Sequence, residues 1–378
     1  MKPLMRLTKF CCCALSILLL FAAAEAGEQK ATVASHSRAS QSLLLDTALA
    51  GDRLLAVGER GHIIYSDDVG DNWQQAQVPS TQMLTAVFFI SDRQGWAVGH
   101  DGLILVTRDG GESWLLQRDG LAAQENLNQT DRDRAQARLA ELETALASAN
   151  EDIVEDLRFN LEEATMDLED AEQLLLESNF APPLMDIWFQ NDSLGWAVGA
   201  FGTLLQTSDG GKNWQSVDQR IDNPEGFHFY GITGNSNGQL FIAGETGGLY
   251  RSMDAGLSWQ QLDSPYDGSW FGVLQQPSSG ALWVFGLRGN IFRSSDFGSS
   301  WTPAGNDNTM TIAGATIAED GIVVMVGSVG TVLRSNDGGI NFEAFMQPNR
   351  LSLSSIVADS EGNYFAAGQG GIHALDLK

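Results

Sequence analysis

Six short acidic stretches of the chain share one pattern, in which Ser or Thr, Asp, Gly and an aromatic residue stand at fixed spacings. The first is SDDVGDNW, from Ser66 to Trp73. A carboxylate repeated at one position of a turn can ligate a metal ion or act as an acid or base, so these aspartates are the first candidates for chemistry. The repeated aspartates are Asp68, Asp109, Asp209, Asp254, Asp296 and Asp337, and the aromatic residues that close each stretch are Trp73, Trp114, Trp214, Trp259, Trp301 and Phe342.

The same residue types also have a structural explanation. An Asp carboxylate accepts backbone N–H bonds within a turn, Gly supplies a positive φ, and an aromatic ring at the start of the next strand can be buried against a neighbouring sheet. Because this explanation covers all six copies, we interpret the pattern as hairpin closure and assign no catalytic residue to it. The histidines lack metal-ligand spacing, so we predict no metal and no cofactor; they are His36, His62, His100, His228 and His373.

A second motif, Gly-x-x-Gly, precedes each acidic stretch and occurs once more near the end of the chain. Its first glycines are separated by 41 to 45 residues, with one interval of 100, and stand at Gly58, Gly99, Gly199, Gly244, Gly286, Gly327 and Gly368. A period of about 40 to 50 residues is typical of propellers and solenoid arrays. Seven copies favour one closed domain.

One repeat, Leu84–Gln117, contains four short apolar runs separated by turn-forming residues, as in a four-stranded propeller blade. We therefore predict an all-β fold over residues 27–378: a seven-bladed β-propeller of four-stranded antiparallel blades. The acidic motif falls between the third and fourth strands. The seventh blade lacks this motif and an outer strand, and we expect Gln29–Ser37 to supply that strand and close the ring.

The long interval predicts an inserted α-helical hairpin between blades two and three, over residues 119–180. Residues 121–178 contain no Gly, Pro or Trp, and their apolar residues recur at spacings of three and four, as in amphipathic helices and coiled coils. A single helix of about 55 residues would separate its ends by about 80 Å, so the insert must double back. We place the turn at Ser148–Asp152, with Asn150 or Asp152 capping the second helix.

The insert carries 17 Asp or Glu and four Arg between Asp119 and Glu177, a net charge of −13 in a chain of net charge −26. Its role has two interpretations: a solvated helical face, or a projecting arm for a partner protein on the face of the inter-blade connectors. Strong acidity argues against nucleic acid and anionic membrane surfaces as partners.

The first 26 residues are typical of a secretion signal. Basic residues precede the apolar run Phe10–Phe21, and Ala22–Ala26 offers small-residue cleavage sites. An uncleaved anchor is the alternative. Cys11–Cys13 stand at the start of the apolar run, where lipid attachment is not expected. We therefore predict an extracytoplasmic or periplasmic protein, soluble or peripherally attached to the membrane, that folds without disulfides.

Arginines recur just before the Ser of the acidic motif in three successive blades, at Arg251, Arg293 and Arg334. These cations could bridge neighbouring blades through local carboxylates, or they could form a docking patch for an acidic partner. Arg60 and Arg288, inside Gly-x-x-Gly turns, are weaker candidates for partner binding on the connector face.

A sialidase-like glycoside hydrolase is the alternative function for a propeller of this kind. That chemistry needs an arginine cluster, a Tyr nucleophile activated by Glu, and an acidic proton donor. No tyrosine can be paired with a particular glutamate from the sequence, and the Arg-Ile-Pro motif of that family is absent. We predict that the chain is not an enzyme.

The stretches GWAVGHDGLILVTRDGGESW and GWAVGAFGTLLQTSDGGKNW, with their five relatives, resemble the photosystem II stability and assembly factor family of Asp-box (BNR-repeat) propellers. The resemblance covers about residues 40–376 apart from the helical insert. It implies a non-enzymatic factor outside the cytoplasm that binds membrane-protein assembly intermediates through an arginine-rich surface, for which Arg251, Arg293 and Arg334 are the candidates. The acidic insert departs from this family, and similar propellers in bacteria without photosystems leave another envelope complex open as partner.

Overall fold

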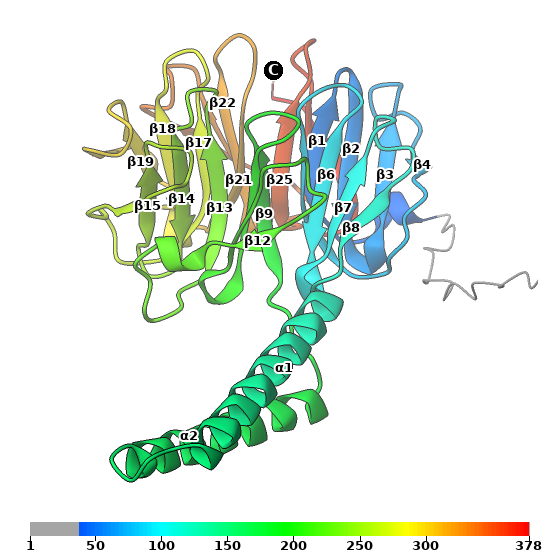
Figure 1. Cartoon of the computed structure of the whole chain (residues 1–378). Helices are drawn as coiled ribbons and strands as arrows, with labels where there is room; N and C mark the ends of the chain where they lie inside the picture. Colours follow the sequence, from blue (N-terminus) through cyan, green and yellow to red (C-terminus); the bar gives the residue numbers. More distant parts are fainter. Residues whose placement is uncertain (1–37, 378) are drawn as a thin grey trace, which may run out of the picture. The chain divides into compact units, whose positions relative to one another are not determined.

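The structure, a computed structural model, describes residues 38–377 and contains seven antiparallel sheets, six of four strands and one of three (Figure 1). The first strands of the sheets are β1 (Leu44–Ala50), β5 (Leu84–Phe89), β9 (Leu184–Phe189), β13 (Phe229–Gly234), β17 (Trp270–Gln275), β21 (Ile312–Ile317) and β25 (Leu353–Ala358). The second strands are β2 (Arg53–Gly58), β6 (Gly95–Gly99), β10 (Gly195–Gly199), β14 (Leu240–Gly244), β18 (Leu282–Gly286), β22 (Val323–Gly327) and β26 (Tyr364–Gly368).

The third and fourth strands complete each sheet toward its outer edge. The third strands are β3 (Ile63–Ser66), β7 (Ile104–Thr107), β11 (Leu204–Thr207), β15 (Leu249–Ser252), β19 (Ile291–Ser294), β23 (Thr331–Ser335) and β27 (Gly371–Leu375). The fourth strands are β4 (Gln74–Gln75), β8 (Leu115–Arg118), β12 (Gln215–Ser216), β16 (Gln260–Gln261), β20 (Thr302–Pro303) and β24 (Glu343–Met346). Each sheet is a meander in chain order, as in a propeller blade.

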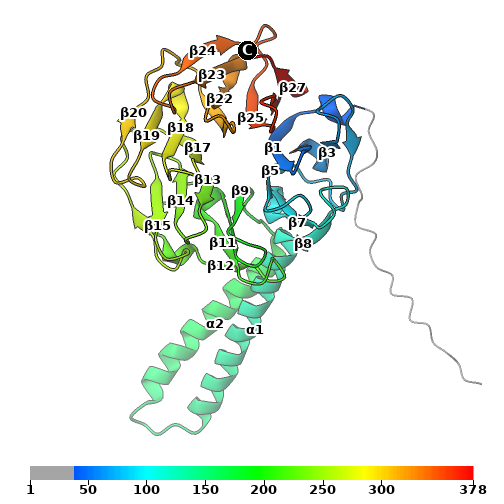
Figure 2. The same cartoon turned by 90° about the horizontal axis from the view of Figure 1, so that it is seen from above.

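The first strands line the axis and close the ring (Figure 2). Each first strand packs against the first strand of the next sheet, and β25 packs against β1. At this closing junction the Ser354 hydroxyl donates to the Leu44 carbonyl at 2.9 Å, and the Ser355 hydroxyl donates to the Asp46 carboxylate at 2.6 Å. The first and last blades are therefore joined at the axis by side-chain hydrogen bonds.

The hydrophobic core lies between the blades. Every residue of the second strands β6, β10, β14, β18, β22 and β26 is buried, which explains their apolar sequences such as GWAVG. Seven apolar clusters among the described residues each combine side chains of two adjacent sheets, including one that joins the seventh sheet to the first. Each blade is thus stabilised mainly by its two neighbours.

The Gly-x-x-Gly motif links the second and third strands of every sheet. Glycine is required at its two positions for different reasons. The first glycine has an extended φ, but a Cβ there would collide with the backbone carbonyl that precedes the first strand; at Gly327 this is the Thr311 carbonyl. The second glycine has a left-handed φ, as at Gly330 with φ +68°. Close packing and turn geometry together therefore explain the repeat.

The residue before the second glycine also has a positive φ, although it is glycine only in the seventh sheet. These turn residues are Arg60, Asp101, Phe201, Thr246, Arg288, Val329 and Gly370. Their side chains mark one face of the ring, which we call the turn face. The connectors between blades reach the same face, because Gly120 in the connector after β8 lies against Asp101 and Gly102.

The predicted helical hairpin is present between β8 and β9, with α1 spanning Gly120–Ala147 and α2 spanning Val154–Leu176 (Figure 1). We call it the arm. Arg138 on α1 pairs with Asp167 on α2 at 2.9 Å. The Asp119 carboxylate caps α1 by accepting from the Ala122 N–H. The predicted cap of the second helix is wrong, because its N-cap residue is Ile153, whose side chain cannot accept a hydrogen bond.

The fold differs from the sequence prediction in its class, and one predicted strand lies outside the described residues. The label all-β omits the two long helices of the arm, so the chain is a β-propeller with a helical insertion. The seventh sheet has three strands among residues 38–377, and Ala39–Gln41 packs against β27. The segment Gln29–Ser37, which we expect to add the fourth strand, and the signal segment 1–26 lie outside the described residues.

Candidate functional site

The Asp motifs form self-contained hydrogen-bonded turns. In the fifth sheet, Asp296 Oδ1 accepts from the Ser294 hydroxyl at 2.8 Å and from the Ser300 N–H at 2.8 Å, while Oδ2 accepts from the Ser300 hydroxyl at 2.6 Å. The same set of bonds recurs in the other five copies, with Asn in place of the last Ser in three of them. Both oxygens of each carboxylate are occupied, as hairpin closure requires.

These bonds favour the ionised carboxylate. Hydrogen bonds from the side chain and backbone of Ser300, followed by the bond from Ser294, lower the pKa of Asp296 to about 2. A catalytic acid at neutral pH would need the opposite shift. Within residues 38–377, no group of three or more His, Cys, Asp or Glu is placed to hold a metal ion.

The motifs also join neighbouring blades. In five of the six motifs the second glycine position lies directly against a second-strand side chain of the preceding sheet, as Gly339 does against Trp283; Gly211 lies instead against Gln117 on β8. The Trp283 Nε1–H donates to the Gly339 carbonyl at 3.1 Å. The closing aromatic residues pack into the clusters between blades, as Trp114 and Phe342 do. The repeated pattern is therefore explained by scaffolding at both its polar and its apolar positions.

Arg251 bridges two blades through uncharged acceptors. Its guanidinium donates to the Phe297 carbonyl at 3.1 Å and to the Ser299 hydroxyl at 2.7 Å, both in the Asp motif of the next sheet, and also to the Gln260 side chain. Arg53 makes a similar bridge, donating to the Gly110 carbonyl and pairing with Asp67 and Glu112. The salt-bridge interpretation of Arg251 predicted carboxylate partners. The structure places backbone, hydroxyl and amide oxygens there instead.

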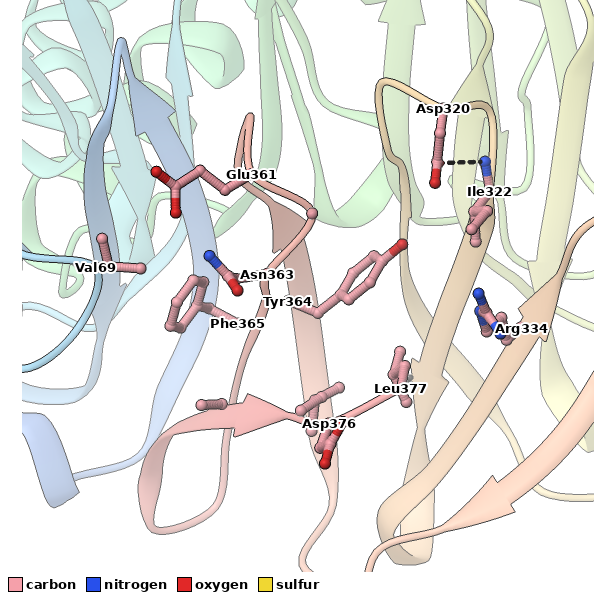
Figure 3. A pocket seen from close by; sticks show the side chains of 13 residues that line it. Val69, Asp320, Ile322, Arg334, Glu361, Asn363, Tyr364, Phe365, Asp376 and Leu377 are labelled. Carbon is pink, nitrogen blue, oxygen red and sulfur yellow. Dashed lines mark hydrogen bonds between the residues drawn. The ribbon is translucent and has the colours of Figure 1, made fainter.

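Arg293 and Arg334 have different surroundings. Arg293 lies over the Trp283 ring at 5.5 Å from its centroid. Arg334 lines a cavity of 680 Å³ beside β27, together with Tyr364 and Leu377 (Figure 3). The next sheet after Arg334 has no Asp motif to accept its hydrogen bonds. The Nε atoms of both arginines are buried without a hydrogen-bond partner in the described structure.

Three arginines instead lie exposed on the turn face. Arg60 and Arg288 are the turn residues of the first and fifth sheets. The third, Arg350, was not predicted from the sequence; its Cα lies beside Gly330 in the sixth sheet. No ion pair links any of these three arginines to another described residue. They lie on blades five, six and one, with blade seven between the last two in ring order. We call them the turn-face arginines.

The other half of the turn face is acidic and aromatic. Blades two, three and four present Asp101, Phe201 and Thr246 at the turn position, with Glu245 beside Thr246. The arm, with its net charge of −13, begins and ends between blades two and three. The exposed residues of the turn face are therefore polarised, with arginines on one side and carboxylates and aromatic rings on the other, although Glu59 adjoins Arg60 on the arginine side.

Two carboxylates line a cavity of 270 Å³ on the ring axis, to which all seven first strands contribute. Asp46 accepts from the Val87 N–H of the second blade, and Asp186 accepts from the Ile232 N–H of the fourth, each at 2.8 Å. Burial raises the pKa of Asp46 to about 6, although hydrogen bonds from Ser355 and backbone N–H groups oppose the shift. Burial, with a smaller contribution from the Asp46 charge, raises the pKa of Asp186 to about 7.

Stability is expected to depend on pH through these two groups. The raised pKa values mean that the folded chain binds more protons than the unfolded chain, in which both groups titrate near their usual 3.8. Their contribution to the free energy of unfolding should fall as pH rises from about 4 to about 7, by roughly 2 to 4 kcal/mol per group. Urea denaturation between pH 4 and pH 8 measures this slope.

The variant Asp186→Asn removes one titrating group. Its free energy of unfolding should therefore fall less steeply between pH 4 and pH 7 than that of the parent chain. Asp296→Asn is the contrasting variant. Its parent carboxylate has a lowered pKa, so the stability that it contributes is present above about pH 4 and lost as pH falls through about 2. An unchanged slope in Asp186→Asn would contradict the assignment of the axial carboxylates.

The lining of the axial cavity lacks the arginine that a sialidase site requires. Tyr230 lines it together with Asp46 and Asp186, and burial followed by the Glu245 charge raises the tyrosine pKa. The residues lining this cavity include no arginine to receive a substrate carboxylate. Both axial carboxylates accept hydrogen bonds from backbone N–H groups of neighbouring blades, so they link adjacent blades at the axis.

Comparison with known proteins adds independent information. A family profile described as "Photosynthesis system II assembly factor YCF48" matches residues 65–132 and 166–331. The unmatched stretch between these segments lies within the arm. A relative from Synechococcus sp. (strain CC9902), "Photosystem II assembly lipoprotein Ycf48", is 26% identical over 192 residues, which are 50% of this chain and 45% of the relative. The match thus spans less than half of that relative.

Solved structures agree on the fold. The structure titled "YCF48 bound to D1 peptide" superposes with a TM-score of 0.60 at 17% identity, covering 88% of this chain and 92% of that one. The β-propeller domain of Doa1, with WD40 repeats, gives a TM-score of 0.60 at 11% identity, covering 93% and 97%. No helix within residues 38–377 is long and apolar enough to span a membrane. Since the family profile covers more than half of the chain, the chain belongs to the photosynthesis system II assembly factor YCF48 family.

Proposed function

We propose that this chain is a non-enzymatic extracytoplasmic scaffold that binds a segment of a membrane protein while the complex containing that protein is assembled. The observation that carries this proposal is the arc of turn-face arginines. Arg60, Arg288 and Arg350 are exposed cations in a chain of net charge −26, and none of them forms an ion pair with another described residue. Such a patch suits an acidic side chain or a terminal carboxylate of a partner.

Two relatives support this type of partner. One is named as a photosystem II assembly lipoprotein, and the structure of another contains a bound D1 peptide. By analogy, we propose that this chain binds a peptide segment of an envelope membrane protein, whether or not that protein belongs to a photosystem. The name of the first relative also makes lipid attachment at Cys11–Cys13, to which the sequence analysis gave little weight, a question for mass spectrometry of the exported protein.

The turn-face arginines should be required for partner capture. We expect the variant Arg60→Glu, Arg288→Glu, Arg350→Glu to lose the membrane protein that co-purifies with the parent chain from a cross-linked envelope extract, because each substitution replaces attraction by repulsion. Capture by the variant should fall at least tenfold, by the loss of about 1.4 kcal/mol or more. Quantitative mass spectrometry of the captured proteins measures the loss.

The matched control is Arg108→Glu, which changes an exposed arginine within an Asp motif of the second sheet. It should retain capture at the parent level. A further comparison uses Arg251→Gln, since Arg251 bridges blades four and five and its loss should lower thermal stability more than partner capture. Equal capture by the triple variant and the parent chain would refute the role of the turn-face arginines.

The alternative function, a sialidase-like glycoside hydrolase, has less support because the axial cavity lacks lining arginines. It remains testable with aryl sialosides and aryl glycosides. We expect no turnover above that of Asp186→Asn. Turnover that disappears in Asp186→Asn would establish the enzyme instead.

A further inference from the structure

A continuous row of aromatic rings crosses the turn face from the base of the arm to the ring axis. Its members are Phe180, Phe201, His228, Tyr230 and Phe271. Successive ring centroids are separated by 5.9, 5.0, 6.2 and 5.2 Å, and each pair is edge-to-face. We call this row the aromatic ladder. The row begins beside the arm, and its last two members line the axial cavity.

Phe201 is the most exposed residue of the central part of the ladder. Its backbone conformation is unfavourable for a bulky side chain. Its side chain is 60% exposed, and its φ of +56° lies in the left-handed region that bulky residues disfavour and Asn tolerates. The ring belongs to none of the apolar clusters between blades. Phe180, at 59% exposure, is its neighbour from the segment that follows α2. Two large apolar side chains are thus presented to solvent side by side.

The ladder is held in place by polar bonds. The Phe201 N–H donates to His228 Nδ1 at 2.8 Å, so this ring nitrogen is an acceptor. The His228 N–H in turn donates to the Glu245 carboxylate at 3.2 Å. These bonds fix the turn of blade three against the entry to blade four. The exposed rings are therefore preorganised before any partner binds.

Carboxylates border the ladder. A cavity of 310 Å³ beside Phe201 is also lined by Asp218 and Asp222. Glu245 accepts from the backbone N–H of His228, and Asp186 lies with Tyr230 in the axial cavity. Arg220 lies between Asp218 and Asp222 in the sequence. It donates hydrogen bonds to the Gln206 side chain and the Gly256 carbonyl, and so links blades three and four.

From this combination we infer that the aromatic ladder binds an extended segment of a partner protein in which Lys or Arg side chains alternate with apolar ones. Aromatic faces and carboxylates together attract cationic side chains, whereas an acidic segment would be repelled. The ladder matches the length of about six extended residues. The acidic arm beside it would increase the rate of encounter with a cationic segment. This surface is separate from the turn-face arginines, so it adds a second recognition element to the proposed function.

The test uses the full mature chain and a fluorescently labelled peptide of alternating lysine and leucine, with binding measured by fluorescence anisotropy at physiological ionic strength. The variant Phe201→Asn should bind this peptide about tenfold more weakly than the parent chain, through the loss of one central ring. Because Asn suits a left-handed φ, the variant should keep the thermal stability of the parent. Asp218→Asn combined with Asp222→Asn should also weaken binding and reduce its dependence on salt.

The matched control is Val329→Asn, which makes the same change at the turn position of blade six, with φ +59°. It should bind the peptide as the parent chain does. If Val329→Asn and Phe201→Asn bind equally, the peptide responds only to the net charge of the protein and the inference is wrong. Tighter binding of a glutamate–leucine peptide would also overturn it. The triple turn-face arginine variant should retain the lysine peptide, so failure of this inference and failure of the proposed function can be distinguished.

Discussion

Trp96→Ala should lower the free energy of unfolding by about 3 to 5 kcal/mol, one of the two largest effects that we expect from a single substitution. Trp96 lies on β6 and is fully buried. Its ring stacks on Phe189 of the next blade, with centroids 3.5 Å apart and an interplanar angle of 8°. Truncation would leave a cavity between blades two and three, where the surrounding strands cannot close it. Urea denaturation monitored by circular dichroism gives the change.

Trp96→Phe is the informative companion variant. It keeps an aromatic ring against Phe189, and it removes the Trp96 Nε1 atom, which is buried without a hydrogen-bond partner in the described structure. We therefore expect a loss below about 1.5 kcal/mol. If Trp96→Phe and Trp96→Ala destabilise equally, inter-blade stacking is not the source of the stability at this site.

Gly327→Ala should cost about 2 to 4 kcal/mol, although it adds only one methyl group. The added Cβ would collide with the Thr311 carbonyl, which is backbone and cannot rotate away. The entry to β21 or the end of β22 would have to move. The midpoint of urea denaturation measures the loss.

The control for Gly327→Ala is Gly338→Ala. Gly338 has a positive φ of +75°, but a Cβ there would meet no atom within 4 Å. Its replacement should cost only about 1 kcal/mol, from backbone strain alone. The pair separates close packing from turn geometry. A loss at Gly338 as large as that at Gly327 would show that the first glycine of the repeat is not required by packing.

The blade number could be predicted because the motifs repeat. Seven copies of one spacing indicate seven blades, and the same Ser/Thr, Asp and Gly types in six turns favour a common structural role over a single special site. The structure confirms seven antiparallel sheets and the helical insertion. Chain geometry predicted that the insert doubles back. The predicted cap of the second helix was wrong, because the N-cap residue of α2 is Ile153, which makes no side-chain hydrogen bond.

Features that occur once were harder to predict. Asp46 and Asp186 stand at one position of the first strand in only two of seven blades, so no repeat marks them. Arg251 donates to the Phe297 carbonyl. Every residue has a backbone carbonyl, so the sequence does not show which one accepts this bond. The aromatic ladder joins residues from three blades and the arm. Only the exposed Phe at a Gly-x-x-Gly turn, Phe201, could have indicated it beforehand.

The polarised turn face suggests how one surface can hold a partner in a defined direction. Arginines lie on blades five, six and one, while Phe201 and the carboxylates beside it lie on blade three and on the connector to blade four. A partner segment with an acidic end and a basic stretch would satisfy both halves in one orientation only. Reversing it would place like charges together, which disfavours the wrong register.

Both ends of the arm meet at a single point of the ring. Gly102 lies against Gly120, where α1 begins, and against Ala181, which follows α2. The propeller therefore needs only a pair of adjacent attachment points at this junction, and the length and sequence between them are free to vary. A fluorescent domain or an affinity module could be grafted there in place of the arm, and natural exchange at the same junction would let one ring acquire new specificities without changing its sheets.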